Sequence, residues 1–227
     1  MASFSLVHGA WHGAWCWDLL AAELQLRGHE VVAVDLPCDD TAATLADYAA
    51  VVPAADVVVG HSLGGLTIPL VRAAHRVYLC AFVPLWGRPV RDLFAERPLV
   101  PGFPDEGITR DALGRTVWVD EEFALSSMYS DCDLTDALAA YARLRPQAGT
   151  IYSGDYPLKR RPRGRSSYIL ATNDRAVSVG WARRAARRRL GVDVCEIATG
   201  HSPMLSRPAD LANLLDEVVA PSAGAGG

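Results

Sequence analysis

The sequence predicts an α/β protein built on a mostly parallel sheet with helices on both faces. Short apolar runs alternate with stretches of helical character, a pattern typical of parallel strands that are buried on both sides. The length of 227 residues fits one such domain, and 50% hydrophobic residues suffice to build its core. One proline-rich stretch interrupts the alternation and predicts an insertion between two strands.

The expected elements follow from hydrophobic periodicity and from the residues that end helices. We expect strands at residues 4–9, 30–37, 56–62, 76–84, 166–172 and 192–199. We expect helices at residues 15–27, 44–52, directly behind the third strand, near 179–190 and at 208–219. Gly28 ends the first of these helices, and Pro208 begins the last.

The interrupting stretch covers residues 85–165. Together with Pro84 at its border it holds eight of the fourteen prolines, and we expect in it two short helices, near 120–129 and 133–144, and no buried strand. We interpret it as a cap, or lid, over the mouth of the sheet, where loops on a rigid scaffold carry specificity. The core then comprises 1–84 and 166–220, and 221–227 is predicted to be a flexible tail.

Composition excludes several classes of protein. The net charge of −4 argues against a nucleic-acid partner, and we interpret the run "ARRAARRRL" at 182–190 as a solvated helix face. Five cysteines without a CxxC pair predict a reduced, cytoplasmic protein. The N-terminus lacks the features of a signal peptide, and no apolar stretch reaches the roughly 18 residues of a membrane span.

The stretch "VVVGHSLGG" at 57–65 carries the strongest chemical signal. It is a G-x-S-x-G motif that follows an apolar strand, and the sharp turn holds the serine in a strained conformation. The residues two positions away must then be small, as Gly60 and Gly64 are. Ser62 is therefore the predicted nucleophile; a glycine turn that contains a serine by chance is the alternative.

A serine hydroxyl is a weak nucleophile until a base accepts its proton. His201 follows the last predicted strand in "IATGHSPMLSRP", at the sheet edge that also carries Ser62, whereas His61 should point elsewhere. Asp174 follows the preceding strand in "ILATNDRAV" and can hold the imidazole in the required tautomer. Asp155 is a weaker alternative, because no strand delivers it to this edge.

Acyl transfer also needs hydrogen-bond donors for the oxyanion of the tetrahedral intermediate. The N–H of Leu63, directly after the serine, is one predicted donor. The loop in "VHGAWHG" supplies the other, because Gly9 lets the backbone approach closely and the N–H of Ala10 follows it. The sequence thus contains a candidate oxyanion hole.

The unit His-Gly-Ala-Trp occurs twice in succession, which places His8 and His12 four residues apart. This spacing suits a metal site on a helix, but His8 ends a strand and no third ligand accompanies the pair, so we predict no metal site. We interpret the first copy as the oxyanion loop. The second copy starts the next helix, with Trp15 and Trp17 packing it in place.

A family resemblance rests on four stretches: "LVHGAWHGAWCW", "GHSLGG", "MYSDCDLTDALAAYARLRPQ" and "GHSPMLSRP". They resemble the plant methylesterase and hydroxynitrile lyase branch of the α/β-hydrolases and its bacterial esterase relatives, over nearly the whole chain. The resemblance implies the α/β-hydrolase fold, a triad of Ser62, Asp174 and His201 in the chain order usual for that fold, and an oxyanion hole at Ala10 and Leu63. It also implies an apolar pocket under the cap.

Two residues distinguish the branches of this family. Hydroxynitrile lyases carry a threonine where this chain has Gly9 and a lysine where it has Ser202. Cyanohydrin cleavage is therefore disfavoured, and Ser62 argues against relatives that use an aspartate nucleophile. The segments on either side of the serine strand are shorter than in the relatives, so we expect truncated or missing helices on one face.

The function that these residues predict is a serine esterase acting on a small hydrophobic ester through an acyl-enzyme, with no metal or organic cofactor. We expect Trp11, Trp118 and Tyr129 to form pocket walls. Two alternatives stay open: a lyase, lactone-forming or cyclising reaction at the same site, and a ligand receptor on a hydrolase fold. A homodimer is an open alternative to a monomer.

Overall fold

The computed structural model describes residues 1–220 and contains a six-stranded sheet within them. All of its strand pairs are parallel, and the order is β2-β1-β3-β4-β7-β8. The strands are β1 (Ser3–Val7), β2 (Glu30–Val34), β3 (Ala55–His61), β4 (Ala73–Leu79), β7 (Arg165–Ala171) and β8 (Val194–Ile197). The predicted α/β class with a parallel sheet is confirmed.

The strand order places a switch point between β1 and β3. From β1 the chain first adds β2 on one side and then returns to add β3 on the other. In open α/β sheets, ligands bind beyond the carboxyl ends of the strands at such a point. The loop after β1 and the turn after β3 both lie there.

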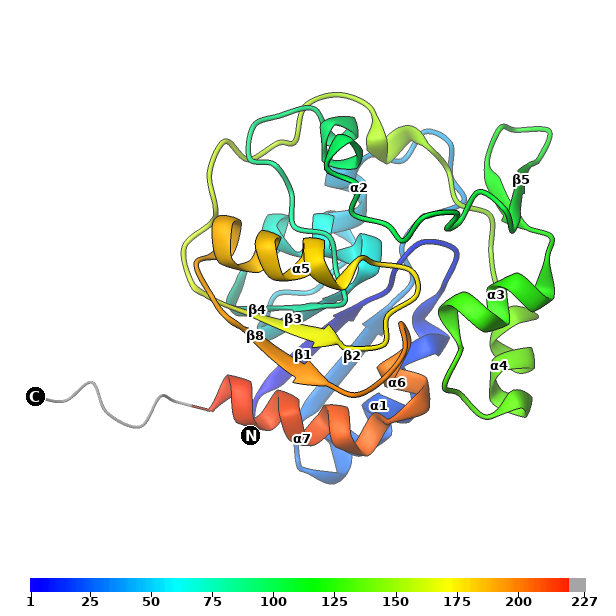
Figure 1. Ribbon diagram of the computed structural model, residues 1–227. Coiled ribbons are helices and arrows are strands. Elements are labelled where there is room, and N and C mark those ends of the chain that lie inside the picture. Colours follow the sequence, from blue (N-terminus) through cyan, green and yellow to red (C-terminus); the bar gives the residue numbers. More distant parts are fainter. Residues whose placement is uncertain (221–227) are drawn as a thin grey trace, which may run out of the picture.

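Helices cover both faces of the sheet (Figure 1), and alternate residues of each strand face opposite sides. Val57 and Val59 of β3 pack with α1 and α7, whereas Val58 belongs to the core cluster that contains α2 and α5. One face of the sheet is covered by α1 (Asp18–Leu26), α6 (Pro203–Ser206) and α7 (Pro208–Val219). The other face is covered by α2 (Leu45–Ala50) and α5 (Val179–Ala185). None of the helices in the described part of the chain is long and apolar enough to cross a membrane.

The helix expected behind the serine strand is absent between β3 and β4, and that expectation is wrong. Two short 3₁₀ turns, Ser62–Leu66 and Ile68–Leu70, take its place. Pro69 has no N–H to continue a helix, and β4 begins at Ala73. Together with the six-residue α2, these turns fit the expected truncation on one face.

The fourth strand also ends earlier than expected. It stops at Leu79, because Cys80 adopts the left-handed conformation with φ 48° and turns the chain out of the sheet. Strand β8 is likewise shorter than the predicted 192–199. The apolar runs in the sequence predicted where these strands lie. They did not predict where the strands end, because the turns that end them depend on tertiary packing.

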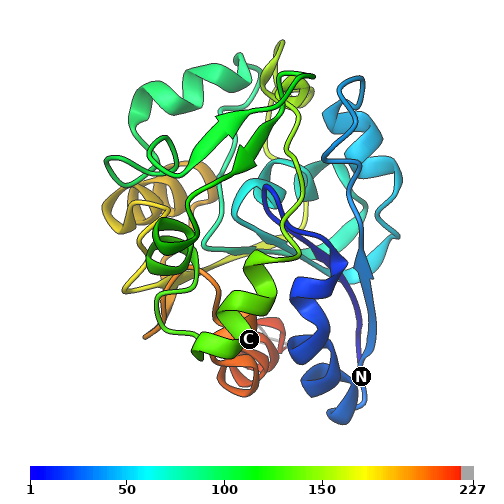
Figure 2. The ribbon, with the colours of Figure 1, turned by 90° about the vertical axis from the view of Figure 1, so that its right-hand side faces the viewer.

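The long connection between β4 and β7 contains both predicted helices, α3 (Glu121–Met128) and α4 (Leu134–Tyr141). It also contains an antiparallel hairpin, β5 (Ile108–Arg110) and β6 (Thr116–Trp118), that the sequence did not predict. In Figure 2 the hairpin and these helices, in green, face the viewer. The predicted tail at 221–227 lies outside the described residues.

Candidate active site

Ser62 occupies a sharp turn directly after β3, where its φ of 51° is unusual for a residue with a side chain. Both flanking glycines are required by close contacts. A Cβ on Gly60 would lie 2.9 Å from the carbonyl oxygen of Gly64, and one on Gly64 would lie 2.6 Å from that of Val7. The strained turn therefore has the form that the G-x-S-x-G motif predicted.

His201 and Asp174 form a buried pair beyond the ends of β8 and β7. The Nδ1–H of His201 donates to Asp174 Oδ2 at 2.9 Å, and the two side chains are 3% and 4% exposed. The other carboxylate oxygen accepts the N–H groups of Ala176 and Val177 at 2.8 and 2.9 Å. Asp174 is thus held rigidly, and Nε2 of His201 is left as a proton acceptor.

The alternative carboxylate, Asp155, is exposed, and its backbone forms a bridge with Pro89 instead. Within residues 1–220 His201 has no side-chain hydrogen bond besides that to Asp174, so none joins it to Ser62. Contacts of this kind often tighten only when substrate binds. The structure places the three predicted triad residues on loops that follow β3, β7 and β8 at one edge of the sheet.

The ring of His61 packs against the imidazole of His201, a contact that the sequence did not predict. Its Nε2–H donates to the carbonyl oxygen of His201 at 2.9 Å, and the two ring centroids are 4.6 Å apart. Burial lowers the pKa of His61 well below its usual value, so the ring stays neutral. The sequence feature that could have indicated this contact is the position of His61 at the end of a buried strand, directly before Ser62.

The two predicted oxyanion donors, Ala10 and Leu63, line the same cavity as Ser62. Neither N–H makes a hydrogen bond to any other group in residues 1–220. Gly9 has no room for a side chain, since a Cβ there would lie 2.8 Å from Cβ of Ser62. The backbone of this loop therefore approaches the serine closely, with two free donors beside it.

The cavity at Ser62 has a volume of about 370 Å³, within the range of small-molecule sites. Most of its wall is apolar, and more than half of its residues come from the connection between β4 and β7. The lining residues are Ala10, Trp11, Ser62, Leu63, Phe82, Phe94, Leu99, Phe103, Pro104, Asp105, Ile108, Thr116 and Tyr152.

The three predicted pocket residues lie in different places. Trp11 lines the cavity, and its Nε1–H donates to Thr116 Oγ1 at 3.0 Å. Trp118 stands behind the wall, with its ring centroid 5.5 Å from that of Trp11. Tyr129 does not line this cavity; its hydroxyl bonds to His12, and it borders a separate depression between α3 and α4. Which of the three residues reaches the cavity is determined by contacts between residues far apart in the chain, which the sequence does not show.

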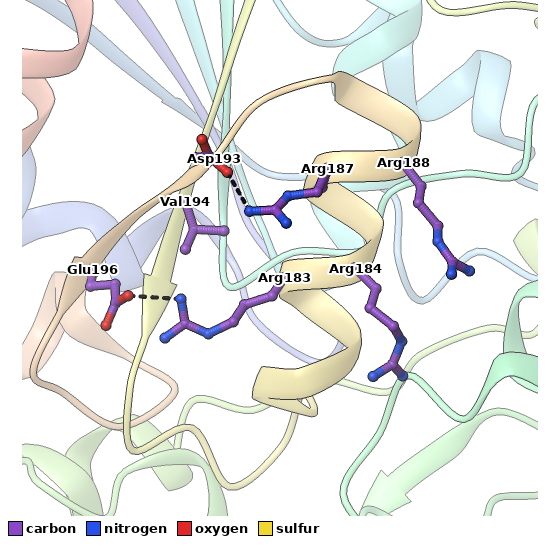
Figure 3. Close-up of a pocket in the computed structure, with 7 residues that line it drawn as sticks. All are labelled: Arg183, Arg184, Arg187, Arg188, Asp193, Val194 and Glu196. Carbon is purple, nitrogen blue, oxygen red and sulfur yellow. Dashed lines mark hydrogen bonds and ion pairs between the residues drawn. The ribbon is translucent and has the colours of Figure 1, made fainter.

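A second cavity, of about 530 Å³, lies against α5 and the following π-helical turn Ala186–Leu190 (Figure 3). Arginines line it, but Arg183 is paired with Glu196 at 2.7 Å and Arg187 with Asp193 at 2.9 Å. It is larger than the cavity at Ser62 and contains no nucleophile. All four of its arginines are exposed and two of them are paired, which agrees with the interpretation of the arginine run as a solvated helix face.

Fold and site together define an α/β hydrolase, and residues 6–214 match the Alpha/beta hydrolase family. The chain belongs to that family. Methylesterase 7 of Arabidopsis thaliana is 31% identical over 259 residues, which span 95% of each chain. Norfluorocurarine synthase 2 of a Strychnos species is 27% identical over 252 residues, 95% of this chain and 94% of the relative.

Among solved structures, polyneuridine aldehyde esterase superposes with a TM-score of 0.80 at 22% identity, over 96% of this chain and 99% of that one. This likeness shows the fold. The predicted resemblance to plant methylesterases and related esterases is confirmed, and the relatives support the predicted class of carboxylic ester hydrolase.

Proposed function

We propose that this protein is a serine esterase that cleaves a small hydrophobic carboxylic ester through an acyl-enzyme. The observation that carries the proposal is the shared placement of Ser62 and two unpartnered N–H groups, of Ala10 and Leu63, on one apolar cavity. Asp174 supports it by holding the tautomer of His201 that can accept a proton.

The proposed reaction has two halves. As Ser62 Oγ attacks the ester carbonyl, His201 Nε2 accepts the hydroxyl proton, and the N–H groups of Ala10 and Leu63 stabilise the oxyanion. Asp174 stabilises the imidazolium, which then protonates the leaving alkoxide to release the alcohol. His201 next accepts a proton from a water that attacks the acyl-enzyme, and as the second intermediate collapses to release the acid, His201 returns this proton to Oγ of Ser62.

The substrate class follows from the cavity and the relatives. A largely apolar volume of about 370 Å³ suits a small ester whose acyl or alcohol part is hydrophobic. The names methylesterase and polyneuridine aldehyde esterase support ester cleavage as the reaction. The mechanism uses protein groups and water alone, and a small ester is the only partner it requires.

A second candidate function is a non-hydrolytic reaction at the same site, such as a lyase, lactone-forming or cyclising step. The similarity to norfluorocurarine synthase 2 favours keeping it as an alternative. Product analysis with a panel of esters and lactones separates the two. Release of the free acid supports the esterase, and the absence of any ester hydrolysis supports the alternative.

The test of the esterase is Ser62→Ala, assayed with a nitrophenyl ester. We expect kcat to fall by at least about 10⁴-fold, because the nucleophile is lost while the fold is kept. A fluorophosphonate probe should label the wild type and not the variant. Ser126→Ala, an exposed serine on α3, is the matched control and should keep wild-type activity.

Two outcomes would count against the proposal. Wild-type turnover by Ser62→Ala would remove Ser62 from the mechanism. A wild-type protein that neither hydrolyses esters nor reacts with the probe would support the receptor alternative.

A further inference from the structure

The two histidines of the repeated His-Gly-Ala-Trp unit share a role that the sequence did not reveal. His8 and His12 are 0% and 2% exposed, so neither ring is available to solvent. Each ring places Nδ1 at 2.7 Å from a carbonyl oxygen of the loop that follows β1. The sequence assigned different roles to the two copies, whereas both histidines bond the same loop.

The ring of His8 fixes the peptide group between Gly9 and Ala10. Its Nδ1–H donates to the carbonyl oxygen of Gly9, because a carbonyl can only accept. Its Nε2 accepts the N–H of Leu36 at 3.0 Å, so both ring nitrogens are satisfied in the neutral form. The carbonyl of Gly9 and the N–H of Ala10 belong to one planar trans peptide and point in opposite directions. Holding the oxygen therefore sets the direction of the Ala10 N–H.

The ring of His12 fixes the next peptide group along the chain. Its Nδ1–H donates to the carbonyl oxygen of Ala10, and its Nε2 accepts the hydroxyl of Tyr129 at 2.8 Å. The ring also stacks on Trp15, with centroids 5.5 Å apart. Trp11, which follows, has a φ of 62°, a conformation that persists only where its surroundings hold it.

We infer that His8 and His12 are positioning residues for the oxyanion hole, which clamp the peptide groups on both sides of Ala10. Its N–H is then aimed into the cavity before substrate arrives, as electrostatic preorganisation requires. This inference rests on the proposed esterase function. It also explains why Tyr129 lies away from the cavity: its hydroxyl supports His12.

Burial keeps both rings neutral, which the clamp needs. Desolvation lowers the pKa of His8 to about 4 and that of His12 to about 3. A doubly protonated ring could not accept the N–H of Leu36 or the hydroxyl of Tyr129. In the neutral form each ring donates once and accepts once, as the loop geometry demands.

The experiment uses the two amide side chains as partial substitutes for histidine. The amide nitrogen of asparagine lies close to the position of Nδ1, and the amide group of glutamine lies close to Nε2. His8→Asn therefore keeps the donor to Gly9, whereas His8→Gln keeps an acceptor for Leu36 and loses that donor. With the nitrophenyl ester, we expect His8→Gln to lower kcat by about 10- to 100-fold. This decrease is smaller than the decrease of about 10²- to 10³-fold that follows when an oxyanion donor is removed altogether.

The expected pattern separates positioning from packing. KM should change less than about threefold in His8→Gln, and His8→Asn should recover kcat to within about fivefold of the wild type. The inhibition constant of a trifluoromethyl ketone, which forms a tetrahedral adduct, should rise in parallel with the loss of kcat. His12→Gln and His12→Asn should repeat this pattern for the neighbouring peptide group.

The matched control is His75→Gln. His75 is another buried histidine, but it lies near the start of β4, at the end of the sheet away from Ser62, where it bonds Ser167 Oγ at 2.9 Å. This variant should keep wild-type kcat even if its unfolding free energy falls as much as that of His8→Gln. The free energy of unfolding of each variant is measured alongside its activity.

Wild-type kcat in folded His8→Gln would overturn the inference, as would equal losses in His8→Gln and His8→Asn. If none of the substituted proteins folds, ¹⁵N NMR of the wild type decides, since protonation of His8 or His12 at Nε2 and not at Nδ1 is incompatible with the clamp. Failure of the proposed function is recognised separately: Ser62→Ala would then keep turnover, whatever the histidine variants do.

Discussion

Asp105 has the single charged side chain among the described residues that line the cavity at Ser62. It is exposed at one side of a cavity whose other walls are mainly aromatic and aliphatic. Aromatic faces and a carboxylate together attract ammonium groups and repel anions. Asp105 is therefore expected to favour esters that carry a positive charge over neutral esters of similar shape.

This bias can be measured with two isosteric esters, one neutral and one bearing a trimethylammonium group. We expect Asp105→Asn to lower the kcat/KM of the cationic ester relative to the neutral ester by about two- to fivefold, the size of an exposed ion pair. Added salt should shrink the wild-type preference. Glu106→Gln is the control, because the carboxylate of Glu106 lies against Gly102 and outside the cavity lining. An unchanged ratio in Asp105→Asn would contradict the expectation.

Helix α3 depends on a cap that the sequence shows directly. Asp120 accepts the N–H of Phe123 at 2.9 Å, which satisfies one of the free donors at the start of the helix. Phe123 packs against Trp118, with centroids 6.3 Å apart, so the helix supports the layer behind the cavity wall. A local polar residue, Asp120, therefore begins the helix, and aromatic contacts hold it in place.

Asp120→Ala should lower the free energy of unfolding by about 1 kcal/mol, the usual loss for an N-cap. Asp120→Asn should have little effect, because asparagine supplies the same acceptor. Urea unfolding followed by circular dichroism measures both variants. Equal stability of the two would show that the cap contributes nothing measurable.

Elements with a complete local signal were predicted well. Helix α7 spans the predicted residues 208–219, since Pro208 begins it and its apolar residues repeat at helical spacing. The hairpin β5–β6 was missed because each strand has three residues, too few for a period to show. The turns after Ser62 were predicted as a helix although Pro69 has no N–H to continue one, and the close approach of Gly65 to the carbonyl oxygen of Phe82 is a contact that the sequence does not show.

The stability of the folded protein depends on pH through four buried histidines. His8, His12, His61 and His75 are buried, and desolvation lowers the pKa of each. At His8, His12 and His75 the unfolded chain binds protons below about pH 6.5, whereas the folded chain binds them only at about pH 4 or lower; at His61 burial shifts proton binding in the same direction. The stability that these neutral rings contribute is therefore fully present above about pH 6.5 and is lost as the pH falls toward 4.

Urea unfolding at pH 7 and pH 5 tests this coupling. We expect a clear loss of unfolding free energy at pH 5, to which each fully buried histidine contributes at most about 1.4 kcal/mol per pH unit. His75→Gln removes one such site and should flatten the dependence. Equal stability at the two pH values would show that these rings are not held neutral.

Part of the candidate active site could be predicted because the chemistry proposed for it follows local patterns. The turn that presents Ser62 needs small residues two positions away, and His201 and Asp174 each follow an apolar strand, so the parallel sheet brings them to one edge. Tyr152 and Phe82 were not predicted as cavity residues, because no motif around them in the sequence indicates that they lie near Ser62. Their place in the wall results from how the connection between β4 and β7 packs.

Strand periodicity, glycine requirements and chain order are local properties, so the amino-acid sequence alone was enough to predict the fold class, the sharp turn at Ser62, the candidate triad and the loop that carries the Ala10 N–H. Which carbonyl each buried histidine bonds and which aromatic rings reach the cavity could be known only from the folded molecule. These outcomes depend on contacts between residues far apart in the chain, such as that of His12 with Tyr129. A hydrogen bond of that kind exists only once packing has brought its partners together.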